Sequence, residues 1–283
     1  MSIKTILAVI AEGTDAEATL APAIALAERH GAHLAALAIT ELPAADYGYG
    51  YGSYGGVATG QFLVERMEEA RERVEALAER LRQRLAGPGI SAEVRTAARS
   101  LAGVAHEVAH HGRYADLVMM ARAGEEGTET QQRAFDGALF DSGRGVALTP
   151  AGWADAFGER IAVAWDGSRP AARAIAAAMP LIEGAREVRV ALVEPKVSDE
   201  DHGPEPGADL GAALARHNPN VTVDRLPSLD RPVAKSLLEH AHDAGADLIV
   251  LGAYGHSRFA EAVFGGVTRD MLRDASLPLL MAH

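Results

Sequence analysis

Short apolar runs alternate with longer amphipathic segments from one end of the chain to the other. Runs such as 116–120, 161–164 and 247–251 are almost entirely apolar, which is typical of strands that helices cover on both faces. The segments between them carry apolar residues at helical spacing. This order of elements predicts a parallel sheet whose strands are connected by crossover helices.

The pattern occurs twice. Late strands repeat at an offset of 131 and early strands at an offset of 155, and the difference, 24, is the length of an insertion in the first copy. We place this insertion between the second and third strands. The aligned segments are Asp116–Met120 with Asp247–Leu251, Val146–Leu148 with Leu277–Leu279, Ile6 with Ile161, and Ala36–Ala38 with Ala191–Val193.

Each copy is predicted to contain five strands and four helices in strict alternation. The fold class is therefore α/β, with two tandem, doubly wound, Rossmann-like parallel sheets of five strands, packed as an internal pseudo-dimer. The predicted domains are residues 1–150 and 159–283, and residues 151–158 form the linker. Within the insertion, the Tyr/Gly-rich segment 47–60 precedes a charged helix at about 61–85. The apolar stripe of that helix, expected to lie on the sheet, is Leu63, Met67, Val74, Leu77 and Leu81.

A glycine-rich loop follows the fourth strand of the second copy. Gly252 and Gly255 are followed, after nine further residues, by Gly265 and Gly266, which gives the pattern G-x-x-G-x9-G. Such glycines let a backbone approach a phosphate closely, and the N-terminus of the following helix adds partial positive charge. The alternative is that these glycines only form tight turns.

A carboxylate stands at the same edge of the predicted sheet. Asp166 follows the first strand of the second copy, where it can accept a ribose hydroxyl or hold magnesium on a phosphate. The alternative is an N-cap of the helix that begins near Arg169, a task that Ser168 can also perform. The bulky Trp165 either stacks on an adenine or packs between helices, and we favour packing.

These motifs resemble the universal stress protein family, and the two copies make the chain similar to tandem members of that family. The resemblance implies the adenine nucleotide alpha hydrolase-like fold and binding of ATP or AMP, with or without magnesium. It also implies a regulatory role in stress responses and no strong catalysis. The nucleotide-binding residues that it implies are Ala164, Asp166, Leu192, Gly252, Gly255, His256, Gly265, Gly266, Val267 and Thr268.

One position departs from the family pattern. Gly266 stands where the family has Ser or Thr, so a hydrogen bond worth about 0.5–1.5 kcal/mol is lost unless Thr268 or a backbone N–H replaces it.

The first copy lacks most of the motif. The offsets place Ala11 at the position of Asp166, and Phe135 at that of Gly266, where its ring would obstruct a phosphate. We therefore expect one nucleotide per chain, with the first copy as a structural or partner-binding half. The remaining correspondences are Ala121 for Gly252, Ala134 for Gly265 and Gly124 for Gly255.

Two other motifs compete with this interpretation. His106-Glu107-Val108-Ala109-His110 matches the zinc-protease pattern H-E-x-x-H. The corresponding segment of the second copy, 233–238, has no potential ligands, and a solvated helix face is the alternative. Residues 50–55 match G-x-G-x-x-G, but they lie well beyond the second strand rather than directly after the first. A mobile loop, a lid or a contact surface is expected there instead.

Composition narrows the choice of partners. The 27 basic and 39 acidic residues give a net charge of −12 without a basic cluster, so nucleic acid is excluded as an expected partner. There is no cysteine and no run of about 20 apolar residues, so we expect a cytoplasmic protein that does not contact a membrane. The expected assembly is a homodimer or internal pseudo-dimer with an unidentified protein partner. Two alternatives remain: a scaffold that binds no nucleotide, and a weak nucleotide- or zinc-dependent hydrolase.

Overall fold

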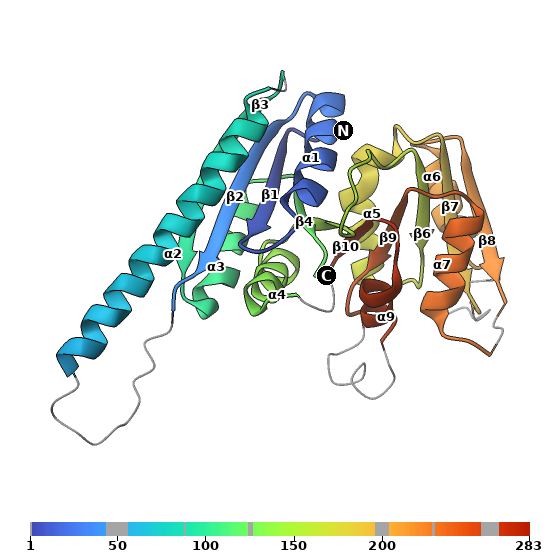
Figure 1. The fold of residues 1–283 in the computed structure, drawn as a ribbon. Coiled ribbons are helices and arrows are strands. Elements are labelled where there is room, and N and C mark those ends of the chain that lie inside the picture. The colour runs from blue at the N-terminus through green and yellow to red at the C-terminus, as the bar shows by residue number, and fades with distance from the viewer. Residues whose placement is uncertain are drawn as a thin grey trace.

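The computed structural model describes residues 2–43, 56–87, 89–123, 127–195, 204–227, 230–255 and 266–283. Within these residues, one sheet of ten strands has helices on both faces (Figure 1). The strand order is β3-β2-β1-β4-β5-β10-β9-β6-β7-β8. The α/β fold class predicted from the sequence is confirmed.

The elements follow the predicted alternation. The first copy contains β1 (Thr5–Ala11), α1 (Ala16–His30), β2 (His33–Glu41), α2 (Gly56–Leu85), β3 (Ser91–Arg99), α3 (Leu101–Gly112), β4 (Leu117–Ala121), α4 (Glu129–Asp136), the π-helical turn η1 (Gly137–Asp141) and β5 (Gly145–Thr149). The second contains β6 (Arg160–Ala164), α5 (Arg169–Ile182), β7 (Glu187–Val193), α6 (Ala208–Ala215), β8 (Val221–Leu226), α7 (Val233–Asp243), β9 (Leu248–Gly252), α9 (Val267–Asp274) and β10 (Leu279–Ala282).

Both copies have the same internal strand order, and their registers agree with the two offsets. Ile6 of β1 pairs with Leu117 of β4, and Ile161 of β6 pairs with Leu248 of β9. Ile6 and Ile161 are therefore equivalent at the early offset, and Leu117 and Leu248 are equivalent at the late offset. The two parallel halves then meet at an antiparallel pair, β5 with β10, in which Leu148 faces Leu279. The sequence predicted two separate sheets of five strands, and this was wrong: the edge strands β5 and β10 pair with each other, so the two copies share one continuous sheet.

The alignment of the second strands is wrong by one residue. Ile6 pairs with Leu34, whereas Ile161 pairs with Val188, so the true offset between β2 and β7 is one less than the offset between β1 and β6. In the same register, Leu34 pairs with Ala92 of β3, and Val188 pairs with Val221 of β8. The connection from β2 to β3 exceeds the connection from β7 to β8 by one residue more than the sequence offsets indicated.

Two apolar layers flank the sheet. Side chains from α1, α2, α5 and α6 fill one layer, and those from α3, α4, η1, α7 and α9 fill the other. Consecutive strand residues point to alternate layers, which accounts for the unbroken apolar runs in the central strands. None of the described helices is long and apolar enough to cross a membrane.

Only the later part of α2 packs against the sheet. Val74, Leu77 and Leu81 are buried as predicted, whereas Leu63 and Met67 remain partly exposed. The helix begins earlier than expected, at Gly56, and its first turns extend beyond the sheet (Figure 1). The predicted stripe is therefore correct only where the sheet lies beneath it.

Candidate functional site

The candidate site lies where the strand order reverses in the second copy. β6 and β9 are neighbours, but the chain continues from β6 toward β7 on one side and from β9 toward β10 on the other. The crossovers therefore diverge at the carboxyl ends of these two strands, which is the usual place for a ligand in an open α/β sheet.

Asp166 lies at this point with one carboxylate oxygen engaged. Its Oδ1 accepts a hydrogen bond of 2.9 Å from the backbone N–H of Ser168. The Ser168 hydroxyl accepts from the N–H of Ala171 at 3.2 Å and is the N-cap of α5. Ser168 therefore performs the capping task that was the alternative role for Asp166. Within the part of the chain that the structure describes, Asp166 Oδ2 has no hydrogen-bond or ion-pair partner.

Gly255 lies beside this carboxylate. A Cβ added at Gly255 would lie 3.3 Å from Ser168 Oγ and 3.9 Å from Asp166 Oδ2. The tip of β6 and the loop after β9 are thus in contact, as the sequence predicted. Because the glycine has no side chain, no Cβ stands between the loop backbone and this turn.

The N-terminus of α9 abuts the same loop. Thr268 is 3% exposed, and its Oγ1 accepts a hydrogen bond of 3.2 Å from the backbone N–H of Tyr254. The N-cap residue is Gly266, which has no side chain of its own to cap the helix. The first N–H groups of a helix have no partner within it, so this end has donors for an anion. Asp270 in the first turn is paired with Arg273 at 3.2 Å.

Gly252 has a packing role that the sequence did not predict. A Cβ added there would lie 2.4 Å from the backbone nitrogen of Ala171, in the first turn of α5. The absence of a side chain at Gly252 therefore lets α5 approach the end of β9. Val267, at the start of α9, is partly exposed, while His256 and Gly265 lie outside the described residues.

The two residues expected near the adenine lie on neighbouring strands but face different layers. The Leu192 side chain is 1% exposed and belongs to the layer of α5, whereas Ala164 packs in the layer of α9. Trp165 packs against the α5 layer, in agreement with the packing interpretation. Only the backbone of Leu192 is therefore suited to meet a ligand at the strand ends.

The counterpart site in the first copy is filled by apolar side chains. The residues that replace the motif are all buried, and Glu12 at the tip of β1 forms an ion pair of 2.6 Å with Arg73. A cavity of about 70 Å³ lies beside them, lined by Phe135 and Leu272 among others. Gly124 lies outside the described residues. The buried replacements are Ala11, Ala121, Ala134 and Phe135.

The H-E-x-x-H segment lies on α3 with its histidines exposed. Glu107 binds Arg99 at 2.8 Å and His111 at 3.3 Å. Burial alone would raise the pKa of Glu107, but these two partners outweigh it and lower the pKa. Among the described residues, no group of three or more potential ligands is placed to hold a metal ion. The G-x-G-x-x-G segment, residues 50–55, lies outside the described residues.

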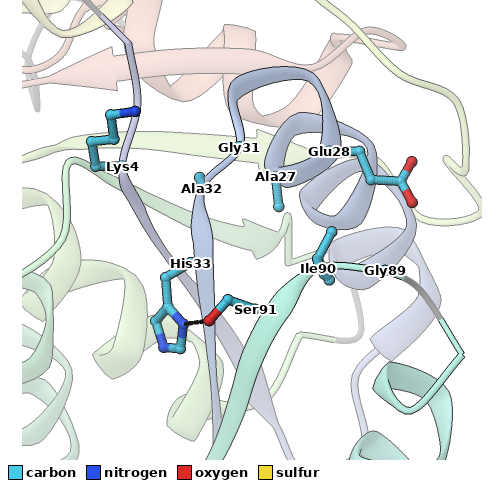
Figure 2. Close-up of a pocket in the computed structure, with 9 residues that line it drawn as sticks. All are labelled: Lys4, Ala27, Glu28, Gly31, Ala32, His33, Gly89, Ile90 and Ser91. Atoms are coloured by element: carbon cyan, nitrogen blue, oxygen red, sulfur yellow. Dashed lines mark hydrogen bonds between the residues drawn. The ribbon is translucent and has the colours of Figure 1, made fainter.

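A larger pocket lies at the opposite edge of the sheet. It has a volume of about 630 Å³ and is formed at the amino-terminal ends of β2 and β3 and the end of α1. Figure 2 shows His33 and Ser91 side by side there, with His33 Nδ1 and Ser91 Oγ 2.8 Å apart. None of the residues predicted to bind nucleotide lines it. The pocket is therefore separate from the carboxyl ends of β6 and β9.

Known proteins share this architecture over the whole chain. A universal stress protein from Archaeoglobus fulgidus has 18% identity and a TM-score of 0.68, covering 98% of this chain and 97% of its own. A protein from Pseudomonas aeruginosa that is described as a putative universal stress protein has 16% identity and a TM-score of 0.57, covering 98% and 92%. At these identities the likeness establishes the doubly wound α/β fold.

The family follows from a separate match. Residues 158–283 match the model of the universal stress protein family. The second copy therefore matches the universal stress protein family, in agreement with the resemblance found in the sequence. No curated protein matches the sequence.

Proposed function

We propose that the second copy binds one adenine nucleotide, ATP or AMP, and that the protein acts in stress responses as a nucleotide-dependent regulator without a catalytic step. One observation carries the proposal: three segments distant in sequence meet at the switch point. They are the turn at Asp166, the loop at Gly255 and the start of α9 at Thr268.

Each part of this arrangement suits one part of a nucleotide. The Oδ2 atom of Asp166 can accept a ribose hydroxyl or coordinate magnesium. The bare backbone near Gly255 and the uncapped start of α9 at Gly266 provide N–H donors for phosphate oxygens. The backbones of Ala164 and Leu192 would meet the adenine. The Thr268 hydroxyl already accepts a hydrogen bond from Tyr254, so a phosphate would have to be bound mainly by backbone groups.

The proposal extends to the whole chain. The domains are residues 1–150 and 159–283, and the first, with its site filled, serves as a structural or partner-binding half. The β5–β10 pair supports an internal pseudo-dimer as the working unit. The location we propose is the cytoplasm, with which the lack of cysteine is compatible.

Calorimetric titration with ATP, with and without magnesium, tests the proposal. We expect saturable binding of one nucleotide per chain, abolished by Gly255→Trp because the indole would occupy the space beside Asp166. The matched control is Gly87→Trp, at a position where an added Cβ meets nothing within 4 Å. Asp166→Asn distinguishes two roles of this carboxylate. If the variant loses only the magnesium-dependent part of the affinity, Asp166 binds the metal. If the affinity falls equally with and without magnesium, Asp166 binds the ribose.

Other outcomes would replace the proposal. If the wild-type protein binds neither ATP nor AMP, the scaffold alternative holds. Appearance of ADP or inorganic phosphate in the titrated sample would indicate a hydrolase. One zinc ion per purified chain, measured by elemental analysis, would favour the zinc-dependent hydrolase with His106 and His110 as ligands.

A further inference from the structure

An aromatic cluster connects the first copy to the candidate nucleotide loop. Phe140, in η1 of the first copy, lies 5.4 Å from the ring of Tyr254 and 5.0 Å from the ring of His283, measured between centroids. The ring planes are inclined at 47° and 73°, which are favourable tilted and edge-to-face arrangements. Figure 1 shows the C-terminal end of the chain between α4 and the second copy.

Tyr254 has a backbone conformation that side chains disfavour. Its φ is +53°, in the left-handed region, and the next residue is Gly255 of the candidate site. A non-glycine residue remains in this conformation only when its surroundings fix it. Two contacts do so: the hydrogen bond from Tyr254 N–H to Thr268 Oγ1, and the ring contact with Phe140.

His283 is held by two hydrogen bonds, one at its ring and one at its backbone oxygen. The Nδ1–H of His283 donates to the carbonyl of Ala253 at 3.0 Å, and Arg173 Nη1 donates to the carbonyl of His283 at 2.8 Å. His283 therefore joins the residue before Tyr254 to helix α5. Phe140 packs against this fixed ring as well as against Tyr254.

The position of Phe140 is in turn set by the first copy. A Cβ added at Gly137, the first residue of η1, would lie 2.1 Å from the carbonyl oxygen of Ala105 in α3. The π-helical turn therefore lies directly on α3, so a shift of α3 would move Phe140 as well. π-Helical turns often occur at functional positions.

We propose that Phe140 is a positioning residue through which the first copy sets the nucleotide affinity of the second. This inference depends on the nucleotide site proposed above. Phe140 holds Tyr254 in its left-handed conformation, so that Gly255 faces Asp166 before a ligand arrives. Preorganisation of this kind raises affinity because less ordering is required on binding. By linkage, a nucleotide in the crevice acts back on η1 and α3.

Two variants test the coupling. Phe140→Ala is expected to weaken ATP binding about five- to thirty-fold, which corresponds to about 1–2 kcal/mol, and Phe140→Leu by an intermediate factor. Phe62→Ala, at a residue of α2 that is 61% exposed, should leave affinity unchanged. Glycine adopts positive φ without strain, so in a Tyr254→Gly background the effect of Phe140→Ala should fall below about twofold.

A second measurement does not depend on nucleotide. Hydrogen exchange at the Tyr254 amide, which donates to Thr268, should become faster in Phe140→Ala and stay unchanged in Phe62→Ala. If wild-type protein binds no ATP, the proposed function fails, and this exchange rate alone then decides whether Phe140 holds the loop. Unchanged exchange at Tyr254 in Phe140→Ala overturns the inference. The inference is also overturned if Phe140→Ala leaves the ATP affinity unchanged while Gly255→Trp abolishes binding.

Discussion

Asp166 and Ser168 divide two tasks at one strand end. Ser168 caps α5, and Asp166 uses one oxygen to brace the turn through the N–H of Ser168. Gly167 between them has a φ of +76°, a conformation that glycine adopts without strain. The turn thus satisfies the start of the helix internally and leaves the second carboxylate oxygen beside Gly255. A strand followed by Asp-Gly-Ser indicates this arrangement, although the sequence alone does not decide which residue is the cap.

Gly252 provides a test of packing beside the site. Gly252→Ala is expected to lower the free energy of unfolding by about 1–3 kcal/mol, because the new Cβ would lie 2.4 Å from the Ala171 nitrogen. Thermal unfolding measures the loss. Gly184→Ala, whose added Cβ meets nothing nearer than 3.8 Å, is the control and should leave the melting temperature nearly unchanged. Equal melting temperatures for the two variants would show that α5 moves away without cost.

At the scale of elements, apolar runs predicted the strands well but not their register. Strands covered on both faces have no alternation of polar and apolar residues, so a shift by one residue leaves the pattern almost unchanged. This explains the misalignment of β2 with β7. The structure assigns Leu192 to the layer of its true counterpart, Ala38, whereas the predicted counterpart, Leu37, faces the other layer.

The connection between the β9 loop and α9 depends on one hydroxyl. Thr268→Val keeps the shape of the side chain but leaves the Tyr254 N–H without its acceptor, a change that costs about 1–3 kcal/mol when the group is buried. We expect lower thermal stability and weaker ATP binding in the same variant. Thr268→Ser retains the oxygen and should restore most of both. If Thr268→Val binds ATP as the wild type does, the hydrogen bond does not shape the site.

At the scale of the whole molecule, the sequence predicted the repeat and the contact between the Asp166 turn and the Gly255 loop, but not how the copies are joined. The offsets identified both halves, and the switch-point rule pointed to the carboxyl ends of β6 and β9. Two contacts had no signal in the sequence: the pairing of β5 with β10, and the contact of Phe140 with Tyr254. Each joins residues that lie far apart along the chain, and neither a local pattern nor a motif spans that distance.

Where the two copies meet, β5 packs closely against α5, and two substitutions can test this contact. A Cβ added at Gly145 of β5 would lie 2.5 Å from the Cβ of Ala177 in α5, which belongs to the other copy. Gly145→Ala should therefore destabilise the chain by about 1–3 kcal/mol. Ala177→Gly removes the opposing carbon and costs about 1 kcal/mol through helix propensity.

In the double variant the two changes should not add. With Ala177→Gly present, the carbon added by Gly145→Ala has room, and its cost should fall to about zero, so the coupling between the sites exceeds about 1 kcal/mol. Chemical denaturation of the four proteins measures it. Ala177→Gly combined with Gly87→Ala, where an added Cβ meets nothing within 4 Å, should be additive. Additivity in both pairs would mean that β5 and α5 do not pack as closely as the continuous sheet requires.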